Sequence, residues 1–153
     1  MNYIKFFKEH SGNIEFLIKD DDDNTYITAY NGAQIYGNIV INWVTAGGYR
    51  YQFENDMSEE EYDNQFPDDR FAKIEQIEVN EKFRSMGYAK ELMDKGISTI
   101  VDRGFDRVYL NASPMGFGGL DVNQLVLFYG KFGFSVIPSL DKWPDNKEMI
   151  LKL

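Results

Sequence analysis

Hydrophobic and polar residues alternate with a period of two over much of the first third of the chain. Ile14, Phe16 and Ile18, for example, would share one face of a strand. This pattern predicts that residues 3–53 form consecutive antiparallel strands joined by turns. The expected segments are strands at 13–19, 25–30, 38–46 and 49–53, a charged turn at 20–24 and a tight turn at Gly47-Gly48.

A second pattern, from Ile74 to Val101, is the one around which the chain is organised. It begins as a strand, in which Ile77 and Val79 alternate with polar neighbours, and continues after a short turn as a helix. Gly104 is expected to end this helix, and a buried strand at 108–111 would complete a β-α-β unit with parallel strands. The apolar residues of the expected helix have helical spacing: Leu92, Met93, Ile97, Ile100 and Val101.

An acidic segment, Glu54–Arg70, lies between the early strands and this unit. Ser58 and Glu61 have the spacing of a capping box, which predicts a short helix. One interpretation of the segment is a solvated connection between two strands, and the other is an acidic lip over a substrate cleft, carrying Tyr62 and Phe66. The segment is also the expected source of substrate specificity, because loops carry such differences on a shared scaffold.

The C-terminal third of the chain predicts a loop, a helix and a hairpin. After the glycine-rich loop 113–119, Asp121 is a suitable N-cap for a helix that runs to about Lys131. Residues 134–137 and 148–153 have the pattern of a closing β-hairpin. Together the elements predict an α/β (α+β) fold, with a central mixed sheet whose N-terminal strands are mostly antiparallel.

Composition narrows the class of protein. The 153 residues suffice for one domain, 1–153, with a buried core, and no apolar run is long enough to cross a membrane. The N-terminal residues lack a signal-peptide core, so a cytoplasmic location is expected. There is no cysteine, and the one histidine, His10, is expected in a surface turn. Thiolate mechanisms are therefore excluded, a Ser-His-Asp mechanism has almost nothing to work with, and no metal is expected.

The net charge of −9 argues against a nucleic-acid partner, since no cluster of lysine and arginine is present to neutralise phosphates. An acidic surface favours cationic partners such as amines, polyamines and lysine-rich proteins, although acidity also serves solubility alone. The aspartates at 20–23 lack the spacing and the closing glutamate of a calcium loop, which favours a solvated hairpin turn. No membrane partner is expected.

The turn that joins the strand and the helix of the central unit is Arg84-Ser85-Met86-Gly87-Tyr88-Ala89. A helix that opens directly from a strand presents unpaired backbone N–H groups, which together with the helix dipole favour an anion such as a phosphate. The turn has neither the Walker pattern nor G-x-G-x-x-G. By itself it is compatible with a nucleotide- or phosphate-binding protein.

Arg84-x-x-Gly87-x-Ala89 resembles the coenzyme-A loop of the GNAT acetyltransferase family, R/Q-x-x-G-x-G/A. A second resemblance lies in the C-terminal helix, which matches the family pattern L-x-x-F/L-Y-x-x-x-G-F at Leu125, Phe128, Tyr129, Gly133 and Phe134. The two motifs occur in the family's order and in the expected β-α-β context. The resemblance covers about residues 74–134.

This resemblance implies transfer of an acetyl group from acetyl-CoA directly to a primary amine: a small amine, a polyamine, or a protein lysine or N-terminus. It implies that the strand separates from its neighbour near Ile77 and Val79, where backbone groups pair with the pantetheine arm. Lys82, Arg84 and Lys90 would add local positive charge for the pyrophosphate. The implied coenzyme residues are Ile77, Val79, Arg84, Ser85, Met86, Gly87, Tyr88, Ala89, Asn111 and Phe128.

The resemblance also implies catalytic roles. Tyr129 stands where the family has a general acid that protonates the leaving thiolate, and the alternative is a core aromatic. The ordinary pKa of a phenol is about 10 and that of a thiol is about 8.5, so a modest shift of either pKa by the protein environment would match the two groups. The base is open between Glu75 and Glu78, which are expected to point to opposite faces of the strand. Asn111 either pairs with pantetheine or substrate, or only caps a strand end.

The chain departs from the family in two places. Most members have two helices between their first and second strands that help to form the acceptor site, whereas residues 3–53 look wholly β. The position seven residues before Tyr129, often asparagine in relatives, is Val122, next to Asn123. A second class of function therefore stays open: a non-catalytic module of the same fold that binds CoA or another protein. The exposed strands also leave a homodimer open.

Overall fold

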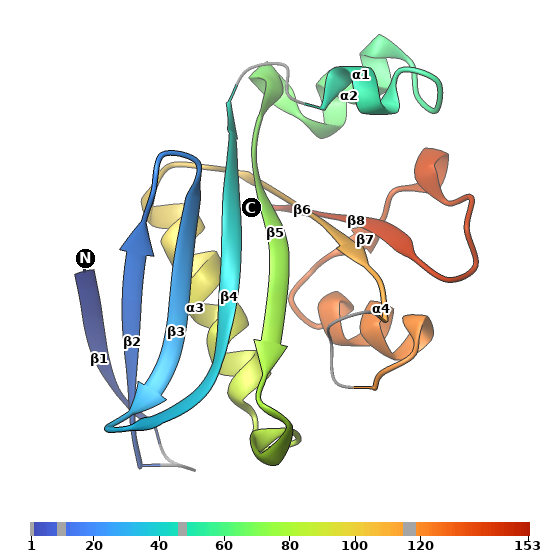
Figure 1. The fold of residues 1–153 in the computed structure, drawn as a ribbon. Coiled ribbons are helices and arrows are strands. Elements are labelled where there is room, and N and C mark those ends of the chain that lie inside the picture. Colours follow the sequence, from blue (N-terminus) through green and yellow to red (C-terminus); the bar gives the residue numbers. More distant parts are fainter. Residues whose placement is uncertain (1, 9–11, 46–48, 115–118) are drawn as a thin grey trace.

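The computed structural model describes residues 2–8, 12–45, 49–114 and 119–153. Within these ranges eight strands form one sheet in the order β1-β2-β3-β4-β5-β6-β8-β7 (Figure 1). Neighbouring strands are antiparallel except β5 and β6, which confirms the mixed α+β fold and the closing hairpin. The strands are β1 (Asn2–Lys8), β2 (Gly12–Asp20), β3 (Asn24–Asn31), β4 (Gln34–Thr45), β5 (Arg70–Val79), β6 (Arg107–Ala112), β7 (Ser135–Val136) and β8 (Lys147–Lys152).

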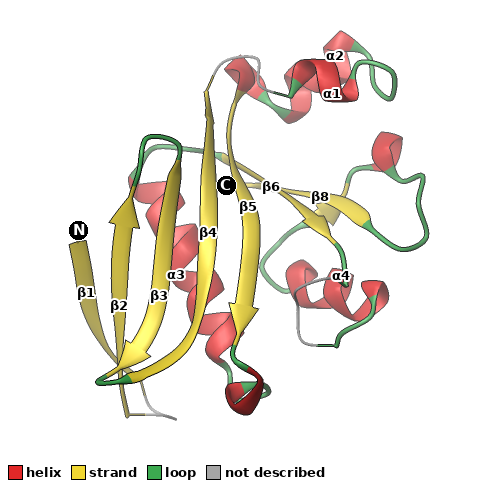
Figure 2. Cartoon of the chain, in the orientation of Figure 1, coloured by secondary structure: helices red, strands yellow, loops and turns green. Residues whose placement is uncertain are grey.

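One long helix covers one face of the N-terminal strands (Figure 2). Leu92, Met93 and Ile100 of this helix, α3, are fully buried against the sheet, as the helical spacing predicts. None of the helices in the described ranges is long and apolar enough to cross a membrane. The helices are α1 (Arg50–Phe53), α2 (Glu59–Gln65), α3 (Tyr88–Asp102) and α4 (Val122–Gly130), with 3₁₀ turns η1 (Pro67–Asp69), η2 (Glu81–Phe83) and η3 (Pro138–Leu140).

The expected strand at 49–53 is wrong, because this segment contains the short helix α1. In a strand, Tyr49, Tyr51 and Phe53 would share one face. In the helix, Tyr49 and Phe53 lie four residues apart on one side, with ring centroids 6.0 Å apart, while Tyr51 is 81% exposed. The predicted turn at Gly47-Gly48 lies outside the described residues.

The segment that carries α1 and α2 builds a second core on the face of the sheet opposite α3. Phe71 of β5 and Tyr109 of β6 alternate with residues of the α3 core, so their side chains point to this second face. Tyr62 and Phe66 are buried against them, and the ring centroids of Phe66 and Phe71 are 4.4 Å apart. The side chains of Tyr62 and Phe66 are therefore core residues of an inserted helical segment.

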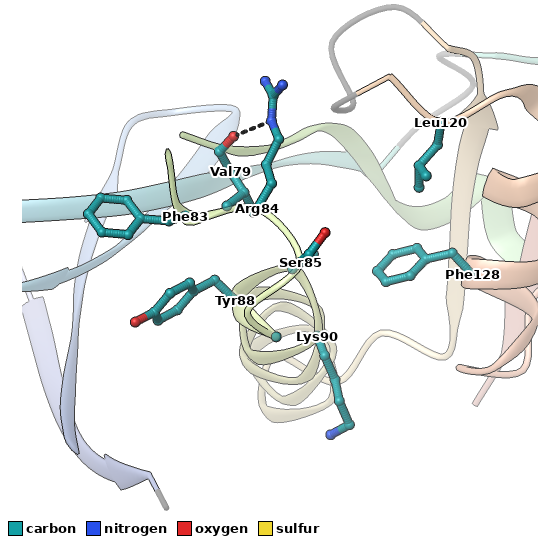
Figure 3. A pocket seen from close by; sticks show the side chains of 10 residues that line it. Val79, Phe83, Arg84, Ser85, Tyr88, Lys90, Leu120 and Phe128 are labelled. Carbon is teal, nitrogen blue, oxygen red and sulfur yellow. Dashed lines mark hydrogen bonds between the residues drawn. The ribbon is translucent and has the colours of Figure 1, made fainter. Parts of the chain in front are cut away.

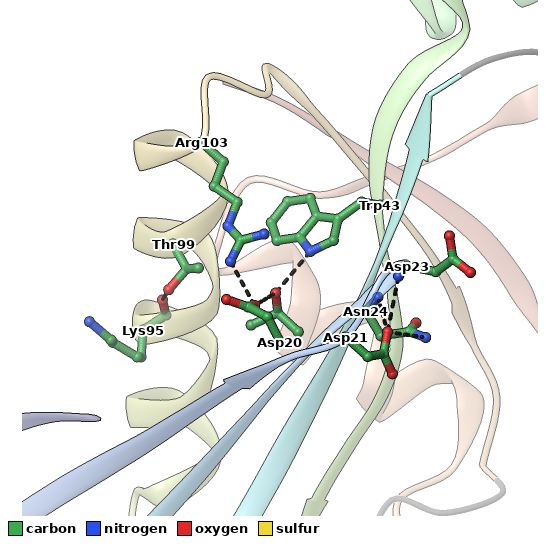
Figure 4. Close-up of polar contacts among 9 residues, drawn as sticks. Asp20, Asp21, Asp23, Asn24, Trp43, Lys95, Thr99 and Arg103 are labelled. Atoms are coloured by element: carbon green, nitrogen blue, oxygen red, sulfur yellow. Dashed lines mark hydrogen bonds and ion pairs between the residues drawn. The ribbon is translucent and has the colours of Figure 1, made fainter. Parts of the chain in front are cut away.

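Two predicted local structures are confirmed. Ser58 caps α2, and its hydroxyl oxygen accepts a hydrogen bond from the backbone N–H of Glu61 at 3.1 Å. The aspartate-rich turn is closed by Asp21, whose Oδ1 accepts from the backbone N–H groups of Asp23 at 3.0 Å and Asn24 at 2.8 Å (Figure 4). The carboxylate therefore serves the hairpin turn itself.

The C-terminal end of α3 is tied to the sheet by a polar cluster (Figure 4). Arg103 Nη2 donates to Asp20 Oδ1 at 2.7 Å, and the Thr25 hydroxyl donates to the same oxygen at 2.5 Å. Trp43 Nε1 donates to Thr25 Oγ1 at 2.8 Å, and the Arg103 guanidinium lies 4.6 Å from the Trp43 ring centroid. Gly104 follows with φ = +77°, as expected for a residue that ends the helix. This cluster helps to fix the direction in which the opposite end of α3 points.

Candidate active site

β5 and β6 separate partway along their length. Their parallel ladder ends at Ile74, which pairs with Leu110. On the β4 side, β5 has a bulge at Glu75, an extra residue between two paired positions. Beyond the bulge β5 runs on to Val79 while β6 turns away (Figure 1), so the β6 side of β5 near Ile77 faces an opening. The separation implied by the family resemblance is therefore present.

The loop after β5 turns the chain sharply into α3. Gly87, the N-cap of α3, has φ = +89°, and Ser85 has φ = +64°. A positive φ is unfavourable for residues that carry a Cβ atom, so glycine at 87 allows this turn. The first backbone N–H groups of a helix have no acceptor within the helix, and the dipole of this fifteen-residue helix adds to their attraction for an anion.

A cavity of about 320 Å³ lies between this loop and α4 (Figure 3). Leu120 and Phe128 form its far wall, so the cavity joins the two sequence motifs across the opening. The Tyr88 ring packs away from the cavity, stacked on Tyr36 with ring centroids 4.2 Å apart. The implied coenzyme residues that line the cavity are Val79, Arg84, Ser85, Gly87, Tyr88, Ala89 and Phe128.

The other implied coenzyme residues lie outside this lining. Ile77 is 4% exposed and belongs to the α3 core, whereas Met86 is 51% exposed. Asn111 Nδ2 donates to Glu148 Oε1 at 2.8 Å and to Asn146 Oδ1 at 3.2 Å. The Asn111 side chain is thus part of a polar network between β6 and β8.

The basic residues near the loop differ in where their charges lie. Arg84 Nε donates to the carbonyl oxygen of Val79 at 3.1 Å, which holds the guanidinium at the end of β5. Lys90 also lines the cavity, but its Nζ pairs with Asp94 at 2.6 Å. Lys82 is exposed. Arg84 is therefore the best placed of the three to meet an anion in the loop.

α4 brings Phe128 and Tyr129 to the opening. A capping box starts the helix, as predicted for Asp121: its side chain accepts from the backbone N–H of Gln124 at 2.8 Å, and Gln124 Oε1 accepts from the backbone N–H of Asp121 at 2.9 Å. Tyr129 is 6% exposed, and its ring centroid lies 5.2 Å from that of Phe128. Burial raises the pKa of Tyr129 to about 12, which moves it away from the pKa of a thiol.

Glu75 and Glu78 lie on the same face of the sheet, so the expectation of opposite faces is wrong. The bulge explains the difference, because its extra residue interrupts the alternation along β5. The apolar residues on either side of Glu75-Gln76 both pack in the α3 core, which leaves Glu75 and Gln76 exposed together. Glu75 Oε1 lies 3.3 Å from Lys73 Nζ, and Glu78 Oε2 accepts from Gln76 Nε2 at 3.0 Å.

Sequence reasoning missed several polar residues beside Glu75. Lys73 Nζ donates to the Tyr49 hydroxyl at 2.9 Å. The Tyr109 hydroxyl donates to Glu148 Oε2, on the neighbouring strand β8. The only sequence signal was that polar residues stand two apart on β5 (Lys73 and Glu75) and on β6 (Tyr109 and Asn111). The sequence does not give the register of the sheet, and it is this register that brings the two pairs together.

The opening between β5 and β6, the helix that begins at Gly87 and the second helix across the cavity form the arrangement that the family resemblance implies. A model of the acetyltransferase (GNAT) family matches residues 3–134. The match covers most of the chain and both motifs, and the protein therefore belongs to the GNAT acetyltransferase family. No curated protein matches the sequence.

Several solved structures share the fold at low sequence identity. A GNAT-family acetyltransferase from Staphylococcus aureus Mu50 has a TM-score of 0.54 and 20% identity, with 85% of this chain and 68% of that chain covered. PaiA N-acetyltransferase from Thermoplasma acidophilum, in complex with coenzyme A, has a TM-score of 0.56, 15% identity and coverages of 86% and 62%. YhbS from Escherichia coli, in complex with CoA, has a TM-score of 0.54, 18% identity and coverages of 84% and 58%. The chain thus spans less than two thirds of the last two proteins.

Proposed function

We propose that the protein is an N-acetyltransferase that moves the acetyl group of acetyl-CoA to a primary amine. The observation that carries this proposal is the cavity between the Gly87 loop and Phe128, at the point where β5 leaves β6. The loop N–H groups and the helix dipole suit a pyrophosphate, and the edge of β5 beyond Ile74 suits the amides of pantetheine. The CoA complexes of two proteins with this fold support the proposal.

The chemistry needs no nucleophile from the protein, which fits a chain without cysteine. The nitrogen of a neutral amine attacks the thioester carbonyl carbon, a C–N bond forms and the C–S bond breaks. The amine loses one proton and the sulfur gains one, so the products are an amide and the CoA thiol. Much of the rate can come from holding the two reactants in contact.

Within this proposal, Tyr129 donates a hydrogen bond to the leaving sulfur. With its pKa raised to about 12, the phenol is a weaker acid than a thiol by roughly three to four units, so complete proton transfer to the thiolate costs about 5 kcal/mol. A hydrogen bond from the neutral phenol still stabilises the charge that develops on sulfur. The reaction as a whole conserves protons, because the amine releases one proton and the CoA thiol takes up one.

A non-catalytic module of the same fold is the second candidate. It is favoured by the direct pairing of β1 with β2, at the place where most family members carry helices that shape the acceptor site. In this chain, the helices α1 and α2 lie between β4 and β5 instead. Binding and turnover measurements separate the two candidates.

The first experiment is calorimetric titration of the protein with acetyl-CoA, with Gly87→Val as the paired variant. We expect saturable one-to-one binding to the wild type and at least tenfold weaker binding to the variant, because valine at φ = +89° is strained and would distort the loop. Thermal melting checks that the variant remains folded. Equal affinity in the two proteins would show that the loop does not bind the coenzyme, and competition by ATP but not by CoA would favour a nucleotide site.

The second step is release of CoA thiol from acetyl-CoA in the presence of amines of different classes. Turnover with at least one amine, reduced in Tyr129→Phe while CoA affinity is unchanged, is the expected result. Coenzyme binding without acetyl transfer to any amine would favour the non-catalytic module.

A further inference from the structure

Glu148 of β8 is held in a defined position beside β6, at the level where β6 separates from β5. The Tyr109 hydroxyl donates to its Oε2, and Asn111 Nδ2 donates to its Oε1 at 2.8 Å. Burial and this hydrogen bond raise the pKa of Tyr109 far above its ordinary value, so Tyr109 remains a donor. Both hydrogen-bond donors are neutral, and each carboxylate oxygen keeps a lone pair for another donor.

The register of the sheet places Glu148 across the opening from Glu75. The β5–β6 ladder ends at the pair Ile74–Leu110, and the next residue along each strand is Glu75 on β5 and Asn111 on β6. Asn111 pairs with Glu148 on β8. The two carboxylates thus stand at the same level, on the face of the sheet opposite α3, with one on each side of the separation.

The charges around the two carboxylates differ. Lys73 Nζ lies 3.3 Å from Glu75 Oε1 and donates to the Tyr49 hydroxyl at 2.9 Å. Burial alone would lower the pKa of Lys73, but the Tyr49 hydroxyl and Glu75 outweigh it and raise the pKa, so Lys73 stays charged. The carboxylate of Glu75 is thus paired with a positive charge, whereas the hydrogen-bond partners of Glu148 are neutral. Glu75, one of the two candidate bases on β5, is therefore already engaged in an ion pair.

From this arrangement we propose that Glu148 is the carboxylate that receives the ammonium group of the acceptor and removes its proton, while Glu75 and Lys73 form the opposite wall. The inference rests on the proposed acetyltransferase function and deepens it. Glu75, Lys73 and Glu148 together carry one net negative charge, which one protonated amine neutralises. The acceptor class that fits is a primary amine that is positively charged at neutral pH.

The proton balance of the step is complete. The bound ammonium ion gives one proton to Glu148, and the resulting amine attacks the thioester carbonyl carbon. As the C–N bond forms and the C–S bond breaks, the nitrogen loses its second proton and the sulfur takes up one proton. Glu148 returns its proton to water before the next cycle.

The test compares Glu148→Gln, Glu75→Gln and the exposed control Asp102→Asn, using spermidine, 2-phenylethylamine and a peptide with a free N-terminus as acceptors. We expect Glu148→Gln to lower kcat/KM for the accepted amine by on the order of 100-fold, with the KM for acetyl-CoA unchanged within a factor of two. Glu75→Gln should lose less than tenfold, and Asp102→Asn should match the wild type. Thermal melting confirms that glutamine preserves the fold.

The pH profile distinguishes proton removal from a purely structural role. The acid limb of kcat/KM should disappear in Glu148→Gln and persist in Glu75→Gln. Tyr109 and Asn111 contact Glu148 directly, while Lys73 and Glu75 stand on the other side of the strand separation. Tyr109→Phe, which removes one donor to Glu148, should reduce kcat by about tenfold without a change in CoA affinity. Its retention of full kcat would argue against positioning by Tyr109.

The outcomes separate the two proposals. If the wild type binds acetyl-CoA but acetylates none of the acceptors, the acetyltransferase function fails, and with it the role of Glu148. If the wild type is active and Glu148→Gln stays within threefold of it, or if the acid limb disappears in Glu75→Gln instead, only the assignment of Glu148 is overturned.

Discussion

At the scale of single residues, the environment of Tyr129 gives this side chain a defined contribution to the protein's stability at alkaline pH. Its pKa is raised from 10 to about 12 by burial, so the folded protein keeps the phenol neutral where an unfolded chain would ionise it. The stabilisation from neutral Tyr129 is therefore complete below pH 10 and is lost as pH rises toward 12. The loss amounts to about 3 kcal/mol.

We predict that Tyr129→Phe loses less stability than the wild type between pH 10 and pH 12, by roughly 2 kcal/mol, because the titration is still incomplete at pH 12. Urea denaturation of both proteins at pH 8, 10 and 11.5 measures the difference. Tyr36→Phe is a useful comparison because that tyrosine has only a small exposed surface and its pKa is also raised by burial. Parallel stability curves for wild type and Tyr129→Phe would mean that Tyr129 titrates normally.

Sequence and structure agree on which residues form the loop and the second motif, but not on how their side chains are used. Gly87 was predictable because the turn itself requires a positive φ, a local property of the chain. The engagement of Lys90 by Asp94 was also local, four residues apart on one helix. The pairing of Asn111 with Glu148 was not, since it depends on the strand β8, which begins 36 residues after Asn111.

At the scale of elements, the bulge in β5 decides which face of the sheet carries the candidate bases. A single extra residue reverses the direction of every later side chain in a strand. The sequence around Glu75 contains no glycine or proline to reveal it, so strict alternation gave the wrong prediction for Glu75 and Glu78. The error over Tyr49–Phe53 has a related cause, because the ring of Phe53 packs on Phe66 and Tyr109, which are distant in sequence.

The close approach of β4 to the end of β5 leads to a prediction about two glycines. A Cβ atom at Gly37 would lie 2.2 Å from the carbonyl oxygen of Glu78, whereas one at Gly96 would meet the Cδ1 of Ile39 at 2.8 Å. Backbone must move in the first case, but a side-chain end can rotate in the second. Gly37→Ala should therefore cost 2 kcal/mol or more of unfolding free energy, at the upper range of about 1–3 kcal/mol for overpacking.

Gly96→Ala should change stability by less than about 1 kcal/mol, since alanine favours a helix over glycine by a similar amount. Because the Gly37 contact lies where β5 ends and the loop begins, Gly37→Ala should also weaken acetyl-CoA binding, while Gly96→Ala should not. Urea denaturation and calorimetry measure both effects. Equal stabilities, or equal affinities, for the two variants would contradict the role given to this contact.

At the scale of the whole molecule, positive and negative charges lie in different regions. An anionic coenzyme and a cationic acceptor would therefore be attracted to different parts of the surface. Arg84 lies at the coenzyme loop, whereas the first turn of α2 carries the exposed residues Glu59, Glu60 and Glu61. The segment that bears α2 reaches the face of the sheet opposite α3, where Glu75 and Glu148 lie, through Tyr49, whose hydroxyl accepts a hydrogen bond from Lys73. We infer that the acidic turn attracts cationic acceptors toward that face.

Replacing all three glutamates by glutamine should then raise the KM for spermidine severalfold at low salt and leave the KM for 2-phenylethylamine nearly unchanged. Added salt should reduce the difference between variant and wild type, because at about 0.1 M the Debye length falls to roughly 10 Å. A control variant with Asp22, Asp23 and Asp102 changed to asparagine removes the same charge elsewhere. If that control raises the spermidine KM equally, net charge rather than the α2 turn is responsible. If neither variant changes it, the acidic turn has no part in acceptor binding, and the charge preference resides in Glu75 and Glu148.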